Sequence, residues 1–190
     1  MAAGQKIETD PKKWLAYEVD YGGGKVWLSV PPNHRFKELP QHLVRPFEAS
    51  APRMNQIFTA QYDYGWLRWK NISEFEVTYT VVKLTQALPA DVQPLQFREA
   101  ITRTVETATG RSTIAANYAA EAVADGVNRP WIRAYNPSDE LAEWYATLCR
   151  PDLALIVTPW YLGEKLRQDP EWRANRRALL RQLLGPIRCQ

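Results

Sequence analysis

The two histidines of this 190-residue chain, His34 and His42, are the first candidates for metal binding or proton transfer. They lie eight residues apart in a proline-rich stretch, with Glu38 between them and no cysteine nearby. Protein metal sites need several clustered His, Cys, Asp or Glu ligands at suitable spacing. The sequence therefore predicts two histidines in a surface loop and no metal site.

Nucleophilic catalysis needs a Ser, Cys or Thr beside a base, and Cys149 is the best candidate. Arg150 follows it and could favour the reactive thiolate form. No Gly-x-Ser-x-Gly motif is present in the chain. Because Cys149 ends an apolar stretch, we interpret it as a buried structural thiol.

A pair of acids, Glu74 and Glu76, would share one face of a strand, as a carboxylate pair for acid–base catalysis requires. Thr78 and Thr80 extend the same face. The solvated outer face of a half-buried sheet explains these four polar residues equally well, and we favour that interpretation.

The stretch from Tyr62 to Lys70 combines aromatic rings with cations. Its candidate binding residues are Tyr62, Tyr64, Trp66, Arg68 and Trp69. Aromatic and arginine side chains dominate protein interfaces and can also stack on bases or sugars. Because alternate residues share one face of a strand, Tyr62, Tyr64 and Trp66 could instead form part of the core of a sheet.

A second candidate surface lies near the C-terminus, where Arg173, Arg177 and Arg181 fall off the apolar stripe of a predicted helix. These three arginines could dock onto an acidic partner, or they could form an ordinary solvated face of the helix. Arg176 falls nearer the stripe, and we expect its side chain to snorkel toward water.

Local patterns predict the elements that would position these residues. Alternating apolar residues predict strands over residues 15–21, 26–30, 57–69, 73–84 and 131–135, and a continuous apolar run predicts a strand buried on both faces over 153–157. The glycines at positions 22–24 predict a hairpin turn, since they lack the spacing and the Ser/Thr of a phosphate-binding loop.

Helical spacing predicts helices over residues 97–110 and 113–124, and a final amphipathic helix that starts at Asp169-Pro170 and closes at Gly185-Pro186. The pattern of residues 138–148 predicts a helix capped by Ser138, and a strand is the alternative. We expect a single domain over residues 1–190, with residues 1–12 frayed and a long proline-rich loop over 31–56.

Strands followed by helices and further strands indicate an α+β fold, with a mainly antiparallel twisted sheet and helices packed on it. The order of segments such as "VWLSVPPNHRF", "WIRAY", "LALIVT" and "LLRQLLGPIR" resembles the PsbP-like and DcrB-like α+β fold. That fold includes bacterial proteins that act as chaperones for secreted effectors. The resemblance is one of layout and carries no functional residues with it.

Composition and charge narrow the function further. The net charge is only +3, and it is concentrated in residues 163–188, which argues against general binding to nucleic acid. Two distant cysteines, Cys149 and Cys189, do not resemble the disulfide framework of a secreted domain. No apolar run reaches 18 residues and no secretory signal is present, so we expect a cytoplasmic protein without a membrane span.

The sequence thus favours a non-enzymatic protein-binding module without a cofactor, a bacterial chaperone, adaptor or immunity protein for a secreted effector. Its expected partner is another protein with an acidic or apolar segment, and a homodimer stays open. One alternative is an enzyme or small-ligand binder whose site is assembled from scattered residues such as His34, Glu74 and Glu76. A weaker one is nucleic-acid binding through the aromatic strand and the C-terminal arginines.

Overall fold

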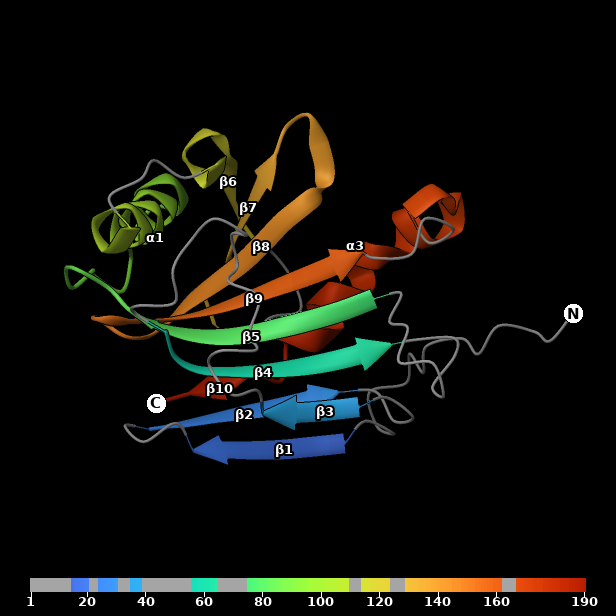
Figure 1. Ribbon diagram of the computed structural model, residues 1–190, viewed down its shortest axis with the longest axis horizontal. Coiled ribbons are helices and arrows are strands. Elements are labelled where there is room, and N and C mark those ends of the chain that lie inside the picture. Colours follow the sequence, from blue (N-terminus) through green and yellow to red (C-terminus); the bar gives the residue numbers. More distant parts are fainter. Residues whose placement is uncertain are drawn as a thin grey trace, which may run out of the picture.

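The computed structural model describes residues 15–20, 24–30, 35–38, 56–64, 75–109, 114–123, 129–161 and 167–190. They form an α+β fold with a seven-stranded and a three-stranded antiparallel sheet (Figure 1). One helix packs on each face of the larger sheet. The fold class predicted from the sequence is confirmed.

The larger sheet has the spatial strand order β3-β4-β5-β9-β8-β7-β6, and every neighbouring pair is antiparallel. Its strands in chain order are β3 (Arg35–Glu38), β4 (Gln56–Tyr64), β5 (Phe75–Lys83), β6 (Ala119–Ala122), β7 (Ile132–Asn136), β8 (Asp139–Arg150) and β9 (Leu153–Tyr161). The short strand β3 lies within the segment predicted to be an irregular loop; residues 31–34 and 39–55 of that segment, like residues 1–12, lie outside the described residues.

The central strand β9 is buried on both faces, as its apolar run predicts. Alternate residues of a strand point to opposite faces, so β9 contributes to two cores. Leu155 and Val157 pack on the side of helix α3 (Pro170–Leu184), and Ile156 packs on the side of helix α1 (Pro94–Thr109).

Both predicted terminal signals of α3 are present. The amide of Glu171 donates to Oδ1 of Asp169 at 2.9 Å, which is an N-terminal cap, and Pro170 is the first helical residue. The amide of Gly185 donates to the carbonyl of Arg181 at 2.8 Å where the helix ends. The buried stripe that α3 lays on the sheet comprises Leu179, Leu180, Leu183 and Leu184.

The smaller sheet has the order β1-β2-β10 and joins both ends of the described chain. Its strands are β1 (Leu15–Asp20), β2 (Lys25–Val30) and β10 (Arg188–Cys189). The β1–β2 pairing confirms the predicted hairpin. Val26 and Leu28 of β2 are buried against the core on the α3 side, so this sheet covers part of that core.

The helix predicted over residues 113–124 is wrong, and over residues 138–148 the structure has the strand that was left open and not the helix. Residues 114–117 form one turn of 3-10 helix (η4, Ile114–Asn117) and β6 follows it, whereas residues 138–148 lie mostly in strand β8. In β8, Leu141 and Tyr145 face the α3 side while Trp144 faces the α1 side. A strand that is buried on both faces can have apolar residues at every position. In β8 the apolar residues happen to lie three and four positions apart, which is also the spacing of one helix face.

The solvated outer face predicted for Thr78 and Thr80 is also wrong, since both side chains are buried. Burial of a hydroxyl is tolerated where a hydrogen bond satisfies it. The indole Nε1 of Trp160 donates to Oγ1 of Thr78 at 3.0 Å. Glu74 and the side chain of Glu76 lie outside the described residues.

Candidate functional site

The exposed side of α3 carries a row of cations formed by Arg173, Arg177 and Arg181, called here the arginine face. Residues four apart lie on one side of a helix, one turn above each other, so the row extends over about 12 Å. Ala174 and Ala178 are exposed beside it, and their methyl groups leave the guanidinium groups uncrowded. The structure therefore brings together the three arginines singled out from the sequence.

Among the described residues, only one arginine of the arginine face lies within ion-pair distance of a carboxylate. Arg177 lies 3.9 Å from Oε2 of Glu140, and both side chains are about half exposed. In the described ranges, no carboxylate lies within ion-pair distance of Arg173 or Arg181. An anionic group from outside could pair with these two cations without displacing a carboxylate of the described residues.

A buried polar cluster lies under α3, centred on Glu143 of β8, whose side chain has no exposed surface. Its carboxylate accepts hydrogen bonds from Nε of Arg133 at 2.5 Å, the hydroxyl of Tyr145 at 3.1 Å and the hydroxyl of Tyr161 at 2.8 Å. These groups come from β7, β8 and β9. A buried charge is stable only when it is paired and hydrogen-bonded in this way.

Arg176 connects α3 to this cluster. Its Nε lies 3.7 Å from Oε1 of Glu143, and its side chain also donates to Glu140 at 2.9 Å and to the carbonyl of Arg173 at 2.6 Å. Arg176 is buried, so the expected snorkelling is wrong: a carboxylate inside the protein attracts the guanidinium more than water does. The contact fixes how α3 sits on the sheet and so orients the arginine face.

We assign the cluster a structural role and not a catalytic one. Both oxygens of Glu143 already bind protein groups, and its side chain has no surface that a substrate could reach. Arg133 and Arg176 each also contact a half-exposed acid. Arg133 donates to Glu121 at 2.9 Å, and Arg176 donates to Glu140. The guanidinium of Arg133 lies 4.0 Å from the centre of the Tyr135 ring, which adds a cation–π contact.

The tyrosines of this core should resist ionisation. Burial first, and then the negative charge of Glu143, raise the pKa of Tyr145 and of Tyr161 above the usual range; burial alone raises the pKa of Tyr79. The pKa of each of these hydroxyls is higher in the folded than in the unfolded protein, where it is about 10. Their contribution to the free energy of unfolding is therefore fully present below about pH 10 and is lost as the pH rises above that value. In an absorbance titration at 295 nm, we expect these three tyrosines to ionise only together with unfolding. Full ionisation of all nine tyrosines in the folded protein near pH 10 would contradict this.

The aromatic strand is only partly described. Trp66, Arg68 and Trp69 lie outside the described residues, whereas the backbones of Tyr62 and Tyr64 belong to β4. Tyr62 is paired with Val77 of β5, and its side chain lies outside the described residues. Whether the strand binds a partner stays a prediction.

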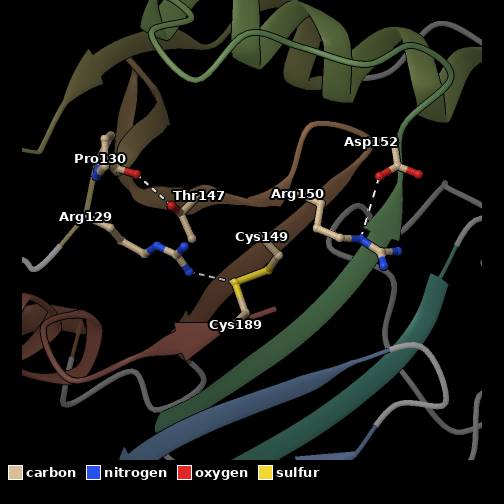
Figure 2. The surroundings of a disulfide bond; sticks show 7 residues. All are labelled: Arg129, Pro130, Thr147, Cys149, Arg150, Asp152 and Cys189. Atoms are coloured by element: carbon tan, nitrogen blue, oxygen red, sulfur yellow. Dashed lines mark hydrogen bonds and ion pairs between the residues drawn. A yellow bond between two sulfur atoms is a disulfide. The ribbon is translucent and has the colours of Figure 1, made fainter.

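The two cysteines form a disulfide between β8 and β10, which corrects the expectation of separate thiols (Figure 2). Cys149 and Cys189 are 40 residues apart in sequence, and only the fold brings them together. The cytoplasmic location stays a prediction that the disulfide weighs against, since such bonds persist mainly in oxidising compartments. No helix in the described ranges is long and apolar enough to cross a membrane.

Most metal and catalytic candidates from the sequence lie outside the described residues. His34 and His42 lie outside the described residues, and Cys149 is engaged in the disulfide. Among the residues that the structure describes, no group of three or more His, Cys, Asp or Glu side chains could hold a metal ion.

Comparison with known proteins identifies no family for this chain. No protein-family model matches the chain, and no curated protein matches it at a significant level.

Proposed function

We propose that this chain is a non-enzymatic protein-binding module that recognises an acidic segment of a partner protein through the arginine face of α3. The single observation that carries the proposal is the exposed row of Arg173, Arg177 and Arg181, two of which have no carboxylate partner in the described part of the chain. Arginine is enriched at protein interfaces because its planar group pairs with carboxylates in a bidentate manner.

The helix that carries the row is well suited to present it. The buried stripe of leucines and the contact between Arg176 and Glu143 hold α3 against the sheet. A surface that is already ordered loses less conformational entropy when a partner binds. The resemblance in layout to effector-associated chaperones supports a more specific role as chaperone, adaptor or immunity protein for a secreted effector.

Replacing all three arginines of the face by glutamine tests this proposal. The probe is a fluorescein-labelled peptide of alternating Glu and Ala, measured by fluorescence anisotropy at low salt. Loss of three exposed charge contacts, at about 0.5 kcal/mol or more each, should weaken binding by about tenfold or more. A matched control is Lys83→Gln/Arg103→Gln/Arg150→Gln, which removes the same charge from exposed positions elsewhere and should bind as the unchanged protein does.

Two outcomes would count against the proposal. Equal weakening in both triple variants would mean that the peptide responds only to net charge. A single-stranded RNA of equal charge that binds more tightly than the peptide, and loses its affinity in the arginine-face variant alone, would favour nucleic-acid binding instead.

A further inference from the structure

An open pocket of about 1000 Å³ is lined by residues of the smaller sheet, and its lining shares no residue with the arginine face or with the Glu143 cluster. Its walls come from β1, β2, Arg129 and the C-terminal residues 186–190. The pairing Glu18↔Trp27 and Arg188↔Trp27 aligns Glu18, Trp27 and Arg188 in one row across the three strands. An acid, an indole ring and a guanidinium therefore line one side of the pocket.

The acid in this row is already neutralised. The carboxylate of Glu18 accepts a hydrogen bond from Nε1 of Trp27 at 2.8 Å and another from Nζ of Lys25. These two hydrogen bonds lower the pKa of Glu18, so it is ionised and paired at neutral pH. The bond from the indole also fixes the orientation of Trp27, and its ring is only half-buried. The ring offers a flat apolar surface to a ligand.

Arg129 lines the same pocket and is poorly satisfied. It is half-buried, and its hydrogen bond in the described structure goes from Nη1 to Sγ of Cys189 at 2.8 Å, a weak acceptor (Figure 2). No carboxylate in the described part of the chain lies within ion-pair distance of Arg129 or Arg188. Burial lowers the pKa of Arg129, because removal from water disfavours the charged form of the guanidinium.

Two structural links hold Arg129 in place. The hydroxyl of Thr147 on β8 donates to the carbonyl of Pro130 at 2.7 Å, which fixes the residue next to Arg129. The disulfide between Cys149 and Cys189 ties β10, with Arg188, to the same strand β8. Figure 2 shows the side chain of Arg129 directed at the sulfur atoms. The residue next to Arg129 and the strand that carries Arg188 are therefore both fixed to β8.

We propose that this pocket is a binding site for a small aromatic carboxylate. The carboxylate would pair with Arg129 and Arg188, and the flat ring would lie on the indole of Trp27. Such a ligand replaces the weak sulfur acceptor of Arg129 by a charged oxygen acceptor, which makes a stronger hydrogen bond. A pocket with a few convergent polar groups and an apolar wall is typical of small-molecule sites.

The test uses the full-length oxidised protein with 2-naphthoate as the probe, measured by isothermal titration calorimetry. We expect saturable binding of one equivalent, and at least tenfold weaker binding of the neutral, isosteric 2-naphthamide. Arg129→Gln and Arg188→Gln should each weaken naphthoate binding by about fivefold or more and leave naphthamide binding unchanged. Arg103→Gln, on the exposed side of α1, is the matched control and should have no effect.

Three results would overturn the proposal: no binding of naphthoate at millimolar concentration, equal affinity for naphthoate and naphthamide, or an Arg129→Gln variant that is folded by circular dichroism and binds naphthoate unchanged. A peptide that ends in phenylalanine forms a second arm, because it offers the same carboxylate and ring. Tighter binding of this peptide than of naphthoate, with loss on C-terminal amidation, would identify a protein C-terminus as the source of the carboxylate. The arginine-face variant should bind naphthoate normally, so failure at one site is distinguishable from failure at the other.

Discussion

Replacing Glu143 by alanine is expected to lower the free energy of unfolding by about 3–5 kcal/mol. The substitution leaves Arg133 and Arg176 buried without their shared anion, and it removes the acceptor of two tyrosine hydroxyls. Uncompensated buried charges of this kind account for the largest effects of single substitutions. Urea denaturation followed by circular dichroism measures the change.

The matched control for this prediction is Glu140→Gln. Glu140 contacts the same Arg176 at 2.9 Å, but its side chain is half exposed, so its loss should cost about 1 kcal/mol or less. If Glu143→Ala does not fold, the milder Glu143→Gln should still fall well below Glu140→Gln in stability. Equal stability of the Glu143 and Glu140 variants would show that the cluster does not anchor α3.

Reduction of the disulfide between Cys149 and Cys189 should lower the free energy of unfolding by about 4 kcal/mol, the loop-entropy value for a closed loop of this length. The bond ties the short strand β10 to β8, and both cysteines contribute to the core on the α3 side. Urea denaturation of the oxidised protein, with and without reductant, measures the difference.

A Cys149→Ala/Cys189→Ala variant controls for side effects of the reductant. Its stability should match that of the reduced protein closely and should not change when reductant is added. Thiol titration of the denatured, unreduced protein should find no free thiol. Two free thiols in that assay would contradict the bond itself.

The sequence predicts much of the fold because several segments carry unambiguous local signals. The Asp169-Pro170 start of α3 and the presence of strand β5 follow from neighbouring residues alone, and both are confirmed. Residues 138–148 could not be assigned in this way. Whether Leu141 and Trp144 share a helix face or occupy opposite faces of a strand depends on what covers the sheet.

The site is predicted less completely than the fold. The arginine row follows from helical spacing, and the structure confirms its exposure. The Glu143 cluster depends on three adjacent strands and a helix, so local patterns do not reveal it. One signal was present: Arg133 stands between Ile132 and Ala134 in a predicted strand that is otherwise apolar, and a charge in such a place needs a buried partner. The disulfide pairing likewise depends on β10 returning to the sheet.

Site-specific photocrosslinking from the arginine face tests the central claim most directly. A benzoylphenylalanine at exposed Ala178, between Arg177 and Arg181, should crosslink in the source cell to one protein. Mass spectrometry should place the crosslinked peptide in an acidic segment of that partner, and the crosslink should disappear when the three arginines become glutamine. Crosslinks that survive this change, or that join only nucleic acid, would contradict the proposed role of α3.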